Sequence, residues 1–345
     1  MVLLAITCSK PQQAETEFGI DLKRDQQPLA ELGPAQDRLC AECHPAEVAD
    51  FKSHGMADSI AVLDAERIPA QLSSEFIASP NSDIKYNVGA SGSWHVNAVH
   101  EASSTSLSIP ISHRIGAGVA DMSFVINQNG RWFFSPLEFF THRGWHPAPH
   151  EVHSSGGLNS VPITAQCLQC HTSSPIPDVY PYNNFGDYQP QPISCATCHG
   201  DGDAHVNLMR ENKFASDVKI LNPRDLSPER QLDICARCHL EGDAHIDLRG
   251  RHNQQLAAGE NLLDAHAVLV ANESAETELR FVSQVQRLSQ SECFQQSPQM
   301  TCTTCHDPHQ AARFQHSADF DAKCQACHSD FKELHRDQTD TANCA

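Results

Sequence analysis

Residues 195–208 read Cys195-Ala-Thr-Cys198-His199-Gly-Asp-Gly-Asp-Ala-His205-Val-Asn-Leu208. Residues 235–248 repeat this arrangement without a gap and again place a second histidine six residues after the first. Both copies begin with the pattern Cys-x-x-Cys-His, which occurs six times in the 345 residues and uses twelve of the fifteen cysteines. We number these motifs 1 to 6 in chain order: Cys40, Cys43 and His44; Cys167, Cys170 and His171; Cys195, Cys198 and His199; Cys235, Cys238 and His239; Cys302, Cys305 and His306; Cys324, Cys327 and His328.

The spacing within each motif is the attachment signature of c-type haem. On one helical turn, residues i, i+3 and i+4 share a face, so two thiols can bond covalently to the porphyrin edge while the imidazole reaches the iron. That histidine is then the proximal ligand. The sequence therefore predicts six haem c groups, each with its iron held by the histidine of one motif.

Zinc sites and disulfides are the alternative uses of these cysteines. Cys-x-x-Cys pairs also build tetrahedral zinc sites, and an exported chain can form disulfides. Neither alternative requires a histidine directly after every second cysteine. Because all six motifs carry that histidine, the sequence favours haem.

Composition and charge narrow the class of partner. Only 6% of the residues are aromatic, although large rings normally carry much of a core, and six porphyrins would supply the missing apolar surface. The formal net charge of −19 argues against nucleic acid, because phosphates require clustered lysine and arginine. We expect redox partner proteins with basic or weakly charged surfaces, or an extracellular electron acceptor. A homo-oligomer or filament stays open.

The first residues predict export. Residues 1–8, Met-Val-Leu-Leu-Ala-Ile-Thr-Cys, resemble the end of a bacterial export signal, although its basic start and most of its apolar core are absent. Cys8 is then a candidate for a lipid anchor, the alternative being an ordinary thiol in a tail. No apolar run approaches the ~18–20 residues of a membrane span, so we expect no transmembrane segment. The expected location is periplasmic, extracellular or, for a lipoprotein, the outer membrane.

We predict a mainly irregular and α-helical multihaem fold, with short helices wrapped around the haems, plus a small antiparallel β insert. Motifs 2 to 6 leave roughly 32 residues each, too few for separate cores, so their haems must pack against one another. The predicted segments are residues 1–36, a signal remnant and polar tether; 37–70, an N-terminal haem module; 71–160, the haem-free β insert; 161–250, a module for haems 2 to 4; 251–292, a linker and bridging helix; and 293–345, a module for haems 5 and 6.

Local patterns predict individual elements. Asn129-Gly130 lies between two β-type runs and predicts a tight hairpin. Ser227-Pro228 predicts a helix N-cap followed by proline at the first helical position. An apolar stripe predicts a helix over residues 273–290. A further strand is predicted from the alternation of apolar residues at Trp94, Val96 and Ala98.

The sequence also predicts the distal iron ligands. His205 and His245 lie too near their own proximal histidines to reach the opposite face of the same haem, but a neighbour's iron is within reach. Such cross-ligation would hold adjacent haems in a fixed geometry. Met56 is the one methionine considered as an alternative ligand. The predicted distal ligands are His54, His205, His245, His309 and His335, with the sixth drawn from His113, His150, His153, His266 and His316.

These features together resemble the multihaem cytochromes c of bacterial respiration, and more closely a group with a leading haem module, a β-rich insert and a C-terminal run of haems. The resemblance implies covalent haem, export and electron transfer, with His54, His205 and His309 as distal ligands. The resembling stretches are residues 53–57, 115–118, 129–131, 135–136, 193–200 with His205, and 291–309, which ends in Cys-His-Asp-Pro-His.

One departure from that group is a run of four histidines within residues 142–153. It could form a second metal site or a substrate pocket beside a haem. The favoured alternative is a proline-constrained loop that supplies one distal ligand. Cys293 is expected to be a structural thiol, because no neighbouring base would activate it. Cys344 either pairs with another cysteine or lies free in a frayed tail.

Three functions stay open. The leading hypothesis is electron transfer through six haems with mostly two histidine ligands each, in which the chain has no catalytic residue of its own. The rival is a reductase or oxidoreductase acting on a small nitrogen or sulfur compound at one haem with an open distal side. The variant motif Cys-x-x-Cys-Lys, often found in such enzymes, does not occur in the sequence. In the third hypothesis the β insert docks the chain into a larger electron-transfer complex.

Overall fold

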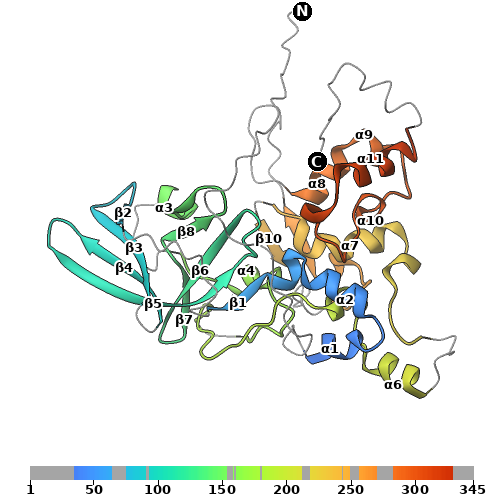
Figure 1. The fold of residues 1–345 in the computed structure, drawn as a ribbon, viewed down its shortest axis with the longest axis horizontal. Helices are drawn as coiled ribbons and strands as arrows, with labels where there is room; N and C mark the ends of the chain where they lie inside the picture. Colours follow the sequence, from blue (N-terminus) through green and yellow to red (C-terminus); the bar gives the residue numbers. More distant parts are fainter. Residues whose placement is uncertain are drawn as a thin grey trace, which may run out of the picture.

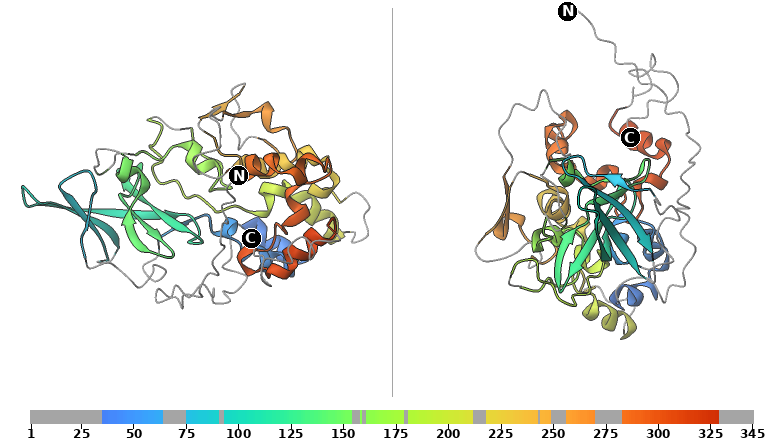
Figure 2. Two further views of the ribbon diagram at one scale, coloured as in Figure 1. Left: turned by 90° about the horizontal axis from the view of Figure 1, so that it is seen from above. Right: turned by 90° about the vertical axis from the view of Figure 1, so that its left-hand side faces the viewer.

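The computed structural model describes residues 35–63, 75–90, 93–153, 158, 161–178, 181–211, 218–242, 244–248, 256–269 and 283–328. An antiparallel sheet occupies one side of the molecule, and short helices that carry the Cys-x-x-Cys-His motifs occupy the other (Figure 1 and the left view of Figure 2). The fold is therefore mixed α/β.

Most neighbouring strands of the sheet follow one another in the sequence, and the sheet is nearly closed. Its main path runs β2-β3-β4-β5-β6-β8-β9, with β1 paired to β5 and β7 paired to β6, and all pairs are antiparallel. The strands are β1 Ile60–Val62, β2 Ile77–Ala78, β3 Ile84–Ala90, β4 Trp94–His100, β5 Thr105–Ile115, β6 Asp121–Gln128, β7 Arg131–Phe134, β8 Leu137–Phe140 and β9 Gly144–Pro147.

The two ends of this path meet at helix α3 (Pro149–His153), which follows β9. Ser79, after β2, donates to the Glu151 carboxylate at 3.2 Å. The Asn81 amide donates to the carbonyl oxygens of Glu151 and Val152, both at 2.9 Å. These hydrogen bonds tie the first hairpin to the helix that follows the last strand.

The sheet has a protein core of its own. Tyr86, Val96, Phe124, Ile126 and Phe139 are each at most 1% exposed and belong to one apolar cluster inside the sheet. Burial of side chains this large contributes roughly 1.5–3 kcal/mol each. The sheet therefore does not depend on a cofactor for its apolar interior.

Two sequence predictions about the sheet are confirmed. Asn129 and Gly130 form the β6–β7 turn with φ of 53° and 87°, the left-handed backbone that a two-residue hairpin turn requires. Trp94, Val96 and Ala98 face the core from β4, while the residues between them are only half-buried.

The motif-bearing half consists of short elements. The helices and 3-10 turns are α1 Ala35–Ala41, α2 Pro45–Lys52, η2 Gly55–Asp58, α4 Ala165–Gln169, α5 Cys195–His199, α6 Asp203–Glu211, η3 Pro223–Asp225, α7 Pro228–His239, η5 Leu262–Asp264, α8 Gln284–Gln290, α9 Glu292–Gln295, α10 Cys302–Cys305, η6 Ala312–Phe314 and α11 Ser317–Gln325. A separate two-stranded sheet joins β10 (Ala244–Asp247) to β11 (His266–Leu269). Helix α7 begins after Ser227 with Pro228 at its first position, as predicted.

The predicted fold class is wrong. We expected a mainly irregular and α-helical fold with a small β insert, but the nearly closed sheet dominates the structure. The physical reason is the apolar core inside the sheet, because a sheet with its own core is a structural unit and not a small insert. The sheet also begins before the predicted insert, because β1 lies within the predicted N-terminal haem module.

The predicted helix over residues 273–290 is shorter where it is described. Ser283 is extended, and its hydroxyl accepts a hydrogen bond from the Gln286 backbone N–H, so α8 begins at Gln284. Residues 270–282 lie outside the described part. No helix within the described ranges has the length and hydropathy of a membrane-spanning segment.

Candidate functional site

Each motif lies on a helix or a helical turn. The backbone N–H of the histidine donates to the carbonyl oxygen of the first cysteine at 2.8 Å in motif 1 and at 2.9 Å in motifs 5 and 6. Motif 3 forms α5, and motif 4 forms the last turn of α7. Residues i, i+3 and i+4 therefore share one face, as covalent attachment of haem requires.

Local sequence fixes where two of these helices start. In motif 3, the Thr197 hydroxyl accepts from the Ser194 backbone N–H at 3.5 Å. In motif 5, Thr304 does the same for Thr301 at 3.0 Å. These reciprocal caps begin each helix at its first cysteine.

Two motif histidines lie close to a histidine from elsewhere in the chain. The ring centroids of His44 and His205 lie 6.5 Å apart with planes 26° from parallel. Those of His199 and His309 lie 6.1 Å apart with planes 6° from parallel. With nitrogen–metal bonds of about 2 Å, two imidazoles on opposite sides of one ion have centroids about 6 Å apart. Both pairs therefore have the spacing of two ligands to one haem iron.

The other nitrogen of these rings supports the same role. His199 Nδ1 lies 2.9 Å from the Leu221 carbonyl oxygen, and His205 Nδ1 lies 2.5 Å from that of Val218. A carbonyl only accepts, so each Nδ1 carries the proton and Nε2 keeps a free lone pair. His309 Nδ1 lies 3.5 Å from the Asp307 carboxylate. An orienting acceptor of this kind is typical of metal-binding histidines.

Helix α6 positions His205 next to motif 1, and the contacts that hold it there are not indicated by the sequence. Arg210 forms an exposed ion pair with Glu42, the residue before Cys43, at 2.8 Å. The Asp37 carboxylate on α1 accepts from the Cys195 backbone N–H at 3.2 Å and from Lys52 Nζ at 2.9 Å. The ion pair of Asp37 and Lys52 is buried, so motifs 1 and 3 are held together by a contact that excludes water.

His54 is placed differently from His205 and His309. Its Nδ1 accepts from the Met56 backbone N–H at 3.1 Å and caps η2. In a neutral ring the proton is then on Nε2, which cannot bind iron in that state. Burial lowers the pKa of His54, with Arg313 and His239 as further causes, and so favours the neutral ring. Met56, the alternative ligand, packs beside Phe51, Ala57 and Ile193.

His245 pairs with His266 rather than with a motif histidine, at 3.0 Å between His245 Nδ1 and His266 Nε2. The two aligned repeats therefore differ in structure: His205 lies on a helix and His245 on a strand. The sequence reads alike in both, but only the second has a partner strand, β11.

The remaining candidates lie near the sheet or at the surface. His113 is 4% exposed on β5, with its ring 4.6 Å from that of Trp132, and burial lowers its pKa to about 4. His150 on α3 lies near Phe134, and burial lowers its pKa too. His316 is exposed before α11. The side chain of His153, and all of His335, Cys8 and Cys344, lie outside the described residues.

Thiols of different motifs touch one another. Cys40 is hydrogen-bonded to Cys195, which lowers the pKa of Cys40 to about 7. Cys235 is hydrogen-bonded to Cys302, which lowers the pKa of Cys302 to about 7. A third pair, in which the contact raises the pKa of the first thiol, is formed by Cys170 and Cys238. These pairs bring together motifs 1 and 3, motifs 4 and 5, and motifs 2 and 4.

Arg237, within motif 4, joins three motifs. Its side chain donates to the Thr197 carbonyl oxygen of motif 3 at 3.4 Å. Its own carbonyl oxygen accepts from the Cys170 thiol of motif 2 at 3.7 Å. Motif 6 meets motif 5 where Lys323 donates to the Cys305 carbonyl oxygen at 2.7 Å. The motifs therefore form a path 1-3-4-5-6, with motif 2 branching from motif 4.

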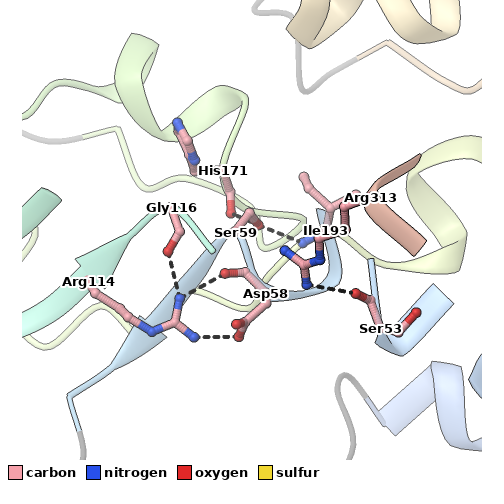
Figure 3. A network of polar contacts seen from close by, with 8 residues as sticks. All are labelled: Ser53, Asp58, Ser59, Arg114, Gly116, His171, Ile193 and Arg313. Atoms are coloured by element: carbon pink, nitrogen blue, oxygen red, sulfur yellow. Dashed lines mark hydrogen bonds and ion pairs between the residues drawn. The ribbon is translucent and has the colours of Figure 1, made fainter. Parts of the chain in front are cut away.

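A short segment before β1 ties the sheet to the motifs (Figure 3). Arg114 on β5 forms an ion pair with Asp58 and donates to the Gly116 carbonyl oxygen. The Ser59 hydroxyl donates to the His171 carbonyl oxygen of motif 2 at 2.7 Å and accepts from the Ile193 backbone N–H at 3.2 Å, just before motif 3.

The segment before β1, residues 53–59, is also bonded to the C-terminal part of the protein. Arg313 of η6 donates to the Ser53 carbonyl oxygen at 3.3 Å (Figure 3). The segment thus connects motifs 2 and 3, the sheet and the C-terminal helices at one place.

The alternatives for the cysteines can be compared with the structure. None of the cysteines that the structure describes forms a disulfide, and Cys293 is exposed. Within the described ranges, no three His, Cys, Asp or Glu side chains are grouped to hold one metal ion, including the described part of residues 142–153. A haem iron needs only two protein ligands, because the porphyrin supplies four nitrogens.

No protein-family model, no curated protein and no solved structure matches the chain.

Proposed function

We propose that this protein transfers electrons through six covalently bound haem c groups, one at each motif. The observation that carries the proposal is the spacing of the His44–His205 and His199–His309 pairs, which suits one iron between each pair of rings. Haem iron supplies one-electron redox chemistry when it is bound. The chain would contribute attachment, axial ligands and burial.

The contacts between motifs support a relay rather than isolated centres. Because cysteines of two motifs lie against each other, thioether bonds at these cysteines would place the porphyrin edges of the two haems close together. Electrons would then pass along motifs 1-3-4-5-6, and motif 2 would form a branch beside the sheet. Neighbours on this path are not always neighbours in sequence.

The ends of the path are accessible for exchange. Cys43 and His44 of motif 1 are exposed, and so are Cys324, Cys327 and His328 of motif 6. The net charge of −19 favours basic partner surfaces at these ends. We place the protein outside the cytoplasm, in the periplasm, at the outer membrane through a lipid on Cys8, or outside the cell, because covalent haem and the residues around Cys8 both fit an exported chain.

A second function has one specific observation in its favour. Because His54 caps η2 through Nδ1, its Nε2 is not available to iron in this conformation. A haem with His54 as its intended distal ligand would then have an open side, where a small nitrogen or sulfur compound could be reduced.

Spectroscopy of the haem-loaded protein separates the two functions. The relay predicts six one-electron reduction steps and an oxidised spectrum that is low-spin throughout. A high-spin haem that responds to nitrite, hydroxylamine or tetrathionate would favour the reductase. Fewer than six electrons taken up per chain would contradict the relay itself.

A further inference from the structure

The β10–β11 pair brings two histidines and a carboxylate together. His245 and Asp247 are two residues apart on β10, so they share one face of the strand. His266 on β11 is directly opposite Asp247 in the antiparallel register. Gly242, two residues before β10, packs against β11, where a Cβ on it would lie 2.4 Å from Val268 Cγ1.

The three side chains form a hydrogen-bonded chain with a defined direction. His266 Nδ1 lies 3.4 Å from the Asp247 carboxylate, and His266 Nε2 lies 3.0 Å from His245 Nδ1. An ionised carboxylate only accepts, so His266 carries its proton on Nδ1 and accepts through Nε2. His245 then donates from Nδ1, which leaves a lone pair on its Nε2.

These hydrogen bonds exclude His266 from the set of distal ligands. Both of its ring nitrogens are engaged, and its side chain is only 3% exposed. The His245 side chain is 28% exposed, and its Nε2 lies 3.8 Å from the Glu241 carboxylate, which is beyond hydrogen-bond distance. Of the three hydrogen-bonded side chains, His245 is therefore the one that can reach a metal.

We propose that Asp247 and His266 are positioning residues that hold His245 in the tautomer and orientation required to bind a haem iron. The inference rests on the proposed function. Because Gln166, on the helix of motif 2, donates to the His245 carbonyl oxygen at 3.2 Å, the haem of motif 2 is the one that His245 serves. A hydrogen-bond acceptor on Nδ1 raises the basicity of the ligand and lowers the potential of its iron.

The test uses the full haem-loaded chain, with haem number by mass and spin state by electron paramagnetic resonance. His245→Ala should convert one haem to high spin, and added imidazole should restore it. His266→Ala should raise the midpoint potential of one haem and leave the other five unchanged. His266→Gln keeps an acceptor for the Nδ1 proton and should stay near wild type. Asp247→Asn should shift the potential in the same direction as His266→Ala by a smaller amount.

Ile246→Ala is the matched control, because Ile246 lies on the same strand with a 43% exposed side chain. It should leave spin states and potentials unchanged. If His245→Ala keeps all haems low-spin, or if His266→Ala shifts no potential, this inference is overturned while the relay stands. A chain that takes up no haem would overturn the proposed function as well. Asp247→Asn keeps the test decisive where His266→Ala does not fold, because a shift of one potential is expected for it as well.

Discussion

The imidazole rings of His199 and His309 lie almost parallel, with centroids 6.1 Å apart, although 110 residues separate them in the chain. His199 is the last residue of motif 3, and His309 follows motif 5 by three residues. Gln310, next to His309, also donates to Asp50 on α2 at 3.2 Å. A ligand pair of this kind would fix motif 3 to the C-terminal segment. The contact of Gln310 with Asp50 joins that segment to the N-terminal helix α2.

Replacing His309 should remove one distal ligand. In His309→Ala we expect one of six haems to become high-spin, because His199 would remain as its only axial histidine. Electron paramagnetic resonance of the oxidised protein measures this change directly.

His316→Ala is the control for that variant. His316 lies seven residues further on, is exposed, and has no motif histidine as a ring partner in the described structure. It should leave the spectrum unchanged. An equal effect of both substitutions would show that the His199–His309 geometry has no part in iron binding.

Arg237 should set the potential of the haems at the branch point. Its positive charge favours the reduced state of nearby iron, so Arg237→Gln should lower at least one midpoint potential. At several ångströms the effect is roughly 1 kcal/mol, or about 40 mV for one electron. Arg237→Lys keeps the charge and should shift the potential less. Spectroelectrochemical titration that shows identical potentials in all three proteins would remove Arg237 from this role.

Much of the candidate site can be predicted from the sequence, because the chemistry lies in short local patterns. Cys-x-x-Cys-His requires only one helical turn, and the structure places every motif on a helix or turn. Likewise Asn129-Gly130 predicts its own hairpin, since the turn depends on two adjacent residues. The haem groups and their ligands stay predictions.

What could not be predicted depends on partners that are distant in sequence. The capping role of His54 depends on the start of η2, and the strand at His245 depends on β11, about twenty residues later. The order 1-3-4-5-6 depends on Asp37, Arg237 and Lys323, none of which stands in a recognisable pattern. The dominance of the sheet depends on the pairing of the nine strands described between residues 60 and 147, which local sequence patterns do not specify.

The sheet should depend on Gly130 more than on Gly144. Both have positive φ, 87° and 78°, so alanine strains the backbone in each. A Cβ at Gly130 would also lie 2.6 Å from Asn184 Oδ1, whereas one at Gly144 meets nothing within 4 Å. We expect Gly130→Ala to lower the free energy of unfolding by about 2–3 kcal/mol and Gly144→Ala by about 1 kcal/mol. Chemical denaturation followed by tryptophan fluorescence measures both, and equal losses would contradict the close contact with Asn184.

The stability of the sheet should fall in mild acid because of His113. Burial lowers the pKa of His113 from 6.5 to about 4, so the unfolded chain binds a proton in this window that the folded chain does not. Stability should therefore decrease as the pH falls from about 6.5 to about 4, by up to about 3 kcal/mol. His113→Leu should remove this part of the pH dependence, and the two proteins should respond to pH in parallel above about pH 7. A His113 bound to iron would not titrate, and the variant would then lose a low-spin haem instead.

The central claim is covalent haem at six places. The direct measurement is the mass of the intact chain after passage through a cell that matures c-type cytochromes, read beside its pyridine haemochrome spectrum. The account predicts the mass of the polypeptide plus six haems. A colourless chain, or one that carries zinc at these cysteines, would contradict it.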